Sequence, residues 1–171
     1  MDILKIVFGF IMALLKDVYS MKYCNVETTG MDIICDCSNH DYRVVPTYIP
    51  HNVTILDLPG NRLTLLYNNT FMLLINLHTL NLVASHVTYL DVNAFDGLQR
   101  FRNFNLESNY LDVKSLKLRV FERIPNLVSM GLSNNLFHIC NGYPDKVLSD
   151  LLQLQSLTIN RMDNVSQVQM Y

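Results

Sequence analysis

Four cysteines are the side chains of this sequence with the clearest chemistry. Cys24, Cys35 and Cys37 lie close together near the N-terminus, and Cys140 lies far along the chain. Thiols at such spacings form disulfides or bind a thiophilic metal. A zinc site needs further ligands, usually in a second pair, and the nearest histidine is the single His40. We therefore expect disulfide chemistry, with Cys24 joined to Cys35 or to Cys37, and we expect no bound metal or other cofactor.

The remaining reactive side chains form no recognisable catalytic arrangement. The sequence has none of the G-x-G, G-x-S-x-G or H-E-x-x-H motifs that bind phosphate, present a nucleophile or hold zinc. Its 13 basic residues are scattered and the net charge is −2, so no basic stripe is present for a nucleic acid. We predict a protein that is not an enzyme and does not bind nucleic acid. The five histidines are also dispersed: His40, His51, His78, His86 and His138.

The first 20 residues have the pattern of a secretory signal peptide. Lys5 precedes an apolar run from Ile6 to Leu15, and Val18, Tyr19 and Ser20 follow at a suitable cleavage position. This run is about half of the roughly 20 residues that a membrane-spanning helix needs. We predict cleavage after Ser20, no membrane span in the chain, and a location that is secreted or on the extracellular side of a membrane receptor.

Secretion favours disulfides for the cysteines and gives meaning to glycosylation sequons. Three sequons are present, at Asn52, Asn68 and Asn164. We expect these three residues to be glycosylation sites.

An apolar pattern recurs along most of the chain. It reads Val53-x-x-Leu56-x-Leu58-x-x-Asn61-x-Leu63. The pattern begins again at Leu77, Phe101 and Leu127, and a decaying copy begins at Leu154, so that successive copies start 24, 24, 26 and 27 residues apart. Such a period indicates a solenoid.

Each position of the repeat has a physical role. Apolar residues two apart point to the same side of a short strand, and a polar residue that follows can bond the backbone where the chain turns out of the sheet. A phenylalanine further along each copy is placed to fill the core from the opposite side. The polar positions are Asn61, Ser85, Asn109 and Asn135, and the phenylalanines are Phe71, Phe95 and Phe121.

These features define leucine-rich repeats. We predict an α/β solenoid, a fragment of a horseshoe with short parallel strands on its concave face and irregular or short helical segments on its convex side. Residues 21–52 form a cysteine-containing N-terminal cap, residues 53–160 about four and a half repeats, and residues 161–171 an irregular tail. A disulfide in the cap contributes about 2–4 kcal/mol. Cys140 has no expected partner within this chain, and the open end after Ile159 is expected to expose apolar surface.

The cap and opening repeats resemble the ectodomains of Toll-like receptors. The resemblance rests on Cys24-x10-Cys35, on Val45-Pro46-x-x-Ile49-Pro50, and on the repeats of about 24 residues that follow. It implies a recognition module of an innate immune receptor, which binds a protein or microbial-pattern ligand and dimerises. Family members carry more repeats, a C-terminal cap, a membrane span and a signalling domain, so this chain corresponds to a fragment or a short secreted form. A secreted extracellular-matrix or adhesion-type leucine-rich repeat protein is the alternative.

The outward side chains of the strands are the candidate ligand surface. They are small and polar, and they include neither arginine nor tryptophan, the residues that often dominate binding energy. A solvated sheet surface therefore remains the simpler interpretation of this face. The candidate residues are Asp57, Thr79, Asn81, Asn103, Asn105, Glu107, Ser129 and Ser133.

Overall fold

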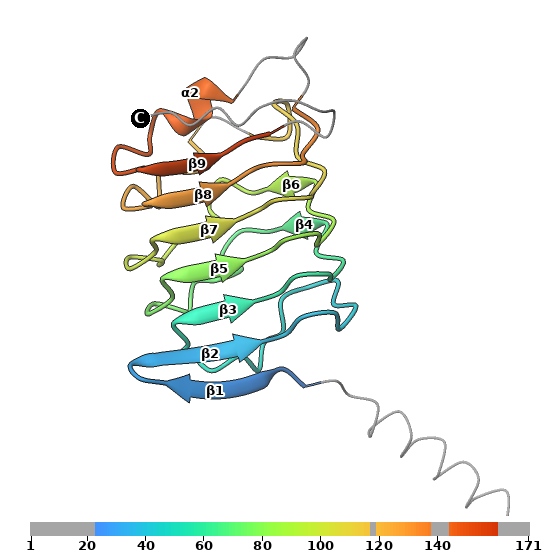
Figure 1. Ribbon diagram of the computed structural model, residues 1–171, viewed down its shortest axis with the longest axis vertical. Helices are drawn as coiled ribbons and strands as arrows, with labels where there is room; N and C mark the ends of the chain where they lie inside the picture. The colour runs from blue at the N-terminus through green and yellow to red at the C-terminus, as the bar shows by residue number, and fades with distance from the viewer. Residues whose placement is uncertain (1–22, 117–118, 138–143, 161–171) are drawn as a thin grey trace, which may run out of the picture.

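The structure of the protein, a computed structural model, describes residues 23–116, 119–137 and 144–160. Its strands stack one above another along the longest axis of the molecule (Figure 1). The predicted signal peptide, the whole of the predicted tail, Cys140 and His138 lie outside the described residues.

One seven-stranded sheet runs the length of the stack. The first two strands pair antiparallel, and all later neighbours in this sheet pair parallel. In spatial order the strands are β1 (Asn25–Thr29), β2 (Asp32–Asp36), β3 (Ile55–Asp57), β5 (Thr79–Asn81), β7 (Asn103–Asn105), β8 (Ser129–Gly131) and β9 (Ser156–Thr158).

The central residue of each repeat strand points into one continuous core. Leu56 is in register with Leu80, which is in register with Phe104, and Met130 and Leu157 continue the row. The first four of these are at most 2% exposed, and Leu157 packs against the same cluster. The predicted leucine-rich repeat solenoid is therefore confirmed.

The convex side consists mainly of turns. Two of its segments, β4 (Leu65–Leu66) and β6 (Tyr89–Leu90), pair parallel as a second small sheet that the repeat pattern did not predict. Among the described residues the α-helix is α2 (Asp145–Leu148), a single turn. The convex side is thus irregular with very little helix.

A row of phenylalanines fills the core between the two sides. Phe71, Phe95 and Phe121 are fully buried. The Phe71 and Phe95 rings stack with centroids 6.2 Å apart, and Phe95 and Phe121 follow at 6.4 Å. Because each ring packs on the ring of the next coil, this spacing couples neighbouring repeats.

The buried asparagines bond the backbone of two coils at once. Asn109 Nδ2 donates to the carbonyl oxygens of Leu82 and Leu106, at 2.8 and 2.9 Å. Its Oδ1 accepts from the backbone N–H groups of Ser85 and Val87, at 3.1 and 2.9 Å. One side chain therefore satisfies four backbone groups that the turn would otherwise leave buried without partners.

Asn61 and Asn135 repeat this arrangement in their own coils. Each donates to a carbonyl of its own coil and to one of the preceding segment. Asn61 accepts from the N–H groups of His40 and Tyr42, and Asn135 accepts from the N–H of Leu111. Ser85 is fully buried at the equivalent position, and its hydroxyl donates to Leu58 O at 2.7 Å. A hydroxyl has one proton to donate, so Ser85 cannot reproduce both donations of an asparagine amide.

The residue before each of these polar positions has a left-handed backbone conformation, with a positive φ. Its N–H donates to a carbonyl of the following coil, as from Gly60 to Val83 and from Ala84 to Glu107. Positive φ places this N–H toward the next coil, and it is a conformation that glycine adopts without strain. The four residues are Gly60, Ala84, Ser108 and Asn134, with φ between 52° and 67°.

The N-terminal cap is a β-hairpin continuous with the sheet. A two-residue turn, with Gly30 at φ 64°, joins β1 to β2. Strand β2 pairs parallel with β3, and Cys35 is in register with Leu56 and fully buried. The cap therefore covers the first repeat by adding a strand to its sheet, whereas the sequence indicated the position of the cap and not its hairpin.

We expect Asn109→Ala to lower the free energy of unfolding by at least about 3 kcal/mol, because four buried backbone groups lose their partner. Urea unfolding followed by far-UV circular dichroism measures this change. The matched control is Asn126→Ala at an exposed position. Equal stability of the two variants would contradict the structural role of the buried amide.

We expect Ser85→Asn to raise the free energy of unfolding by about 1–2 kcal/mol, since an amide can add the hydrogen bonds that the hydroxyl cannot make. By equivalence with Asn109, the new acceptor would face the N–H groups of Asn61 and Leu63. The same unfolding experiment tests this variant. A loss of stability would show that the first two coils lack room for an amide at this position.

Candidate functional site

The outward residues of the repeat strands form two polar rows on the concave face. One row aligns Thr79, Asn103 and Ser129 across β5, β7 and β8. The second row runs from β3 to β9 through Asp57, Asn81, Asn105, Gly131 and Thr158. Parallel pairing fixes both rows, because neighbouring strands lie about 4.8 Å apart and aligned residues share one face.

These rows line a shallow groove of about 430 Å³. Seven of the eight candidate residues named from the sequence lie along it, together with Gly131, an outward position of the same repeat register, and the structure adds Thr158. The seven are Asp57, Thr79, Asn81, Asn103, Asn105, Glu107 and Ser129. Thr158 follows Leu157 in the decaying fifth copy, so the repeat register was the signal that could have identified it.

Ser133 was wrongly predicted to lie on this face. It is 7% exposed, and its Oγ accepts a hydrogen bond from the N–H of Asn160 at 3.1 Å. The position follows the end of β8, where the coil turns inward and the next coil covers it. Ser133 therefore bonds a neighbouring coil rather than facing a ligand.

Amide side chains hold the strand ends that border the groove. Asn81 Oδ1 accepts from the N–H of Val83 at 3.1 Å, and Asn105 Oδ1 accepts from the N–H of Glu107 at 2.9 Å. Asn103 Nδ2 donates to Thr79 Oγ1 at 3.1 Å across β5 and β7. These bonds fix the orientation of the polar groups before any ligand binds.

Glu107 crosses the groove above Gly131. Its Oε1 accepts a 2.6 Å hydrogen bond from Thr158 Oγ1, two strands away from β7. A Cβ at Gly131 would lie 2.7 Å from Asn105 Oδ1 and 3.0 Å from Glu107 Cγ. Glycine is needed at position 131 because the two neighbouring side chains occupy the space of a side chain there.

Two carboxylates meet at the N-terminal end of the groove. Burial raises the pKa of Asp57, the charge of Asp36 raises it further, and a hydrogen bond from Asn81 opposes both. Hydrogen bonds from Ser38 lower the pKa of the neighbouring Asp36. Both side chains come from aligned positions of β2 and β3, so the sheet register sets their repulsion.

A third carboxylate lies at the start of β2. Asp32 Oδ1 is 2.9 Å from His78 Nε2 and accepts from Thr54 Oγ1 at 3.0 Å. The bond to His78 lowers the pKa of Asp32, and the bond to Thr54 acts in the same direction. The contact joins the cap to the second repeat.

Cys24 and Cys37 form the disulfide of the cap, with Cα atoms 4.4 Å apart. Cys35 has a free, fully buried thiol. The spacing of the cysteines in the sequence allowed a disulfide from Cys24 to either Cys35 or Cys37. The register of the hairpin brings Cys24 to Cys37. Asn25 is aligned with Asp36 in the antiparallel pair, which places Cys24 opposite Cys37.

Two of the three predicted glycosylation sites can be located. Asn52 and Asn68 are exposed, which is compatible with a glycan at either residue. Glycosylation of both residues stays a prediction. Asn164 lies outside the described residues.

Comparison with known proteins finds relatives that carry leucine-rich repeats. Leucine-rich repeat-containing protein 3 of Danio rerio is 28% identical over 142 residues, 82% of this chain and 51% of that protein. Human Toll-like receptor 8 is 26% identical over 191 aligned residues, 88% of this chain and 18% of the receptor. Leucine-rich repeat-containing G-protein coupled receptor 5A of Xenopus laevis is 33% identical over 88 residues, 52% of this chain and 10% of that receptor. No protein-family model matches the chain.

The fold and these similarities support a coarse assignment. The chain spans about half the length of the Danio rerio protein and smaller shares of the two receptors. Within the described residues no helix has the length and hydropathy to cross a bilayer. The chain is a leucine-rich repeat module, and its receptor relatives support a role in binding.

We expect Asp57→Asn to raise the melting temperature at pH 7 and to have a smaller effect at pH 3. A raised carboxyl pKa means that the folded state binds this proton more tightly than the unfolded state. Stability therefore falls as pH rises from 3.8 through the folded pKa, and the ionised carboxylate remains destabilising at pH 7.

Differential scanning calorimetry at the two pH values measures the effect, with Glu27→Gln on the exposed strand β1 as the control. An Asp57→Asn protein that was less stable than the wild type at pH 7 would contradict the electrostatic account of this end of the groove.

Proposed function

We propose that this chain is an extracellular recognition module of the Toll-like receptor type, as a fragment or a short secreted form. It binds a protein or microbial-pattern ligand on its concave face without catalysing a reaction. The observation that carries this proposal is the polar groove of about 430 Å³ across β3 to β9.

The groove presents hydrogen-bonding groups in fixed positions. Asn81 and Asn105 use Oδ1 to bond the backbone, and Asn81 also donates a hydrogen bond to Asp57, so the amide of Asn105 keeps its N–H donors for a ligand. Asp57 and Glu107 supply acceptors near its two ends. Because the side chains stand on paired strands, they are already ordered. Binding of a ligand would therefore cost little conformational entropy in the site.

The Toll-like part of the proposal rests on sequence similarity. Human Toll-like receptor 8 aligns with 88% of this chain. The chain corresponds to 18% of that receptor. Signalling and receptor dimerisation are therefore proposed only for a longer assembly in which this module takes part.

A leucine-rich repeat protein outside the Toll-like group, of the secreted matrix or adhesion type, is the second candidate. A place outside the Toll-like group is supported by leucine-rich repeat-containing protein 3 of Danio rerio, of which this chain covers 51%, and by leucine-rich repeat-containing protein 3B of Bos taurus, 26% identical over 77% of the chain. The second candidate predicts binding to a protein partner and no response to microbial products.

We expect Asn103→Arg to weaken ligand binding about tenfold or more, because a long cation in the middle of the groove obstructs the polar rows. Biolayer interferometry with the immobilised chain measures binding. The probes are a bacterial lipopeptide, a lipopolysaccharide, an oligoribonucleotide and a soluble Toll-like receptor ectodomain.

Asn126→Arg introduces the same charge at an exposed position outside the groove and is the control. Binding that survives Asn103→Arg would place the ligand site elsewhere. A chain that binds none of the four probes would count against the Toll-like assignment and in favour of the second candidate.

A further inference from the structure

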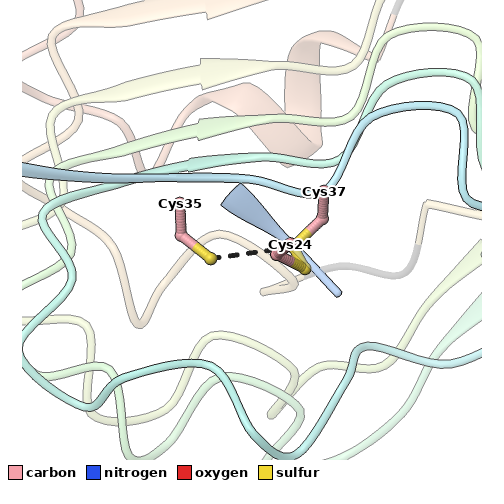
Figure 2. Close-up of side chains that lie close together, drawn as sticks. All are labelled: Cys24, Cys35 and Cys37. Atoms are coloured by element: carbon pink, nitrogen blue, oxygen red, sulfur yellow. Dashed lines mark hydrogen bonds between the residues drawn. A yellow bond between two sulfur atoms is a disulfide. The ribbon is translucent and has the colours of Figure 1, made fainter. Parts of the chain in front are cut away.

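The cap gathers three sulfur atoms in one place. The Sγ atoms of Cys24, Cys35 and Cys37 all lie within 4.8 Å of one another, and Cys35 Sγ is 3.7 Å from Cys37 Sγ. Figure 2 shows the Cys24–Cys37 bond with the Cys35 side chain directed toward it. Such a cluster can hold a metal ion as well as a disulfide.

Two features of the backbone create this cluster. Cys35 and Cys37 are two residues apart in an extended segment, so both side chains point into the core. Cys24 immediately precedes β1, and the hairpin register brings it opposite Cys37. The sequence argument against zinc required a second ligand pair close in the chain, and it did not anticipate that the hairpin would add Cys24.

We propose that, when the Cys24–Cys37 disulfide is reduced, Cys24, Cys35 and Cys37 bind a thiophilic divalent cation such as Zn²⁺. A dithiol reductant supplies two electrons and two protons and leaves two thiols. Binding of the cation then forms three metal–sulfur bonds and releases three protons to solvent. The disulfide and the metal complex exclude each other, because both use the sulfur atoms of Cys24 and Cys37.

The distances suit this ligand set. Zinc–sulfur bonds of about 2.3 Å in tetrahedral geometry place the sulfurs about 3.8 Å apart. Cys35 and Cys37 already have a separation of 3.7 Å. Only Cys24 must withdraw from its covalent contact with Cys37, and its half-buried position leaves a side from which the ion and a water ligand can enter.

The carboxylates of Asp36 and Asp57 favour a cation beside Cys35, whereas burial of this thiol opposes its ionisation. Burial raises the pKa of the Cys35 thiol to about 11, and the charges of Asp36 and Asp57 add to the shift. This environment opposes a bare thiolate, whereas a bound cation compensates the negative charge. Affinity should therefore increase with pH, as protons and metal compete for the three sulfurs.

The test is a Cd²⁺ titration of the reduced chain under anaerobic conditions, followed by ultraviolet sulfur-to-cadmium charge transfer. We expect one equivalent to bind and to raise the melting temperature of the reduced protein, since the ion binds the folded cap. Cys35→Ser should weaken binding about tenfold or more and remove about one third of the charge-transfer intensity, because one of three sulfur ligands is lost.

Cys35→Ser keeps the Cys24–Cys37 disulfide, so the melting temperature of its oxidised form shows whether the variant folds. Cys140→Ser is the matched control and should bind Cd²⁺ as the wild type does. If reduction unfolds the chain, Cd²⁺ must restore its far-UV circular dichroism. The proposal is wrong if Cys35→Ser binds like the wild type, if charge transfer is absent, or if Cd²⁺ lowers the melting temperature or fails to restore folding.

Discussion

The fold depends on hydrogen bonds to the backbone N–H and C=O groups at the point where each coil turns out of its strand. These turns are buried between neighbouring coils, and water cannot reach their N–H and C=O groups. Asn61, Asn109 and Asn135 solve this by bonding their own coil and the preceding one. The same bonds set the stacking distance, and with it the alignment of Leu56, Leu80 and the apolar residues that follow.

This constraint also shapes the concave face. The inward side chains of the strands are committed to the core and the turn residues to the backbone, so the outward side chains of the strands are the ones that this face offers to a ligand. At Gly131 the side chains of Asn105 and Glu107 occupy the space that a side chain would need. The groove is accordingly shallow and polar, and its recognition chemistry is hydrogen bonding by amides, hydroxyls and two carboxylates.

The cap follows the same sheet geometry with different chemistry. Strand β2 extends the parallel sheet, and Cys35 takes the core position that leucine holds in the next strand. The hairpin partner β1 then brings Cys24 to Cys37, so a covalent bond closes the edge that has no preceding repeat. The cysteine side chains supply the buried contact that another coil would supply, and the backbone of β1 supplies the hydrogen-bonding partner of β2.

The sequence by itself determined the positions of the repeat strands, the buried polar residues and the phenylalanine row, because each repeat obeys one local rule and the copies support one another. Seven groove residues followed from the same alternation. Only the tertiary structure decided the partner of Cys24, the burial of Ser133 and the pairing of β4 with β6. Each of these depends on how a segment aligns with a coil or hairpin strand distant in sequence, and hydrogen bonds between coils set that alignment.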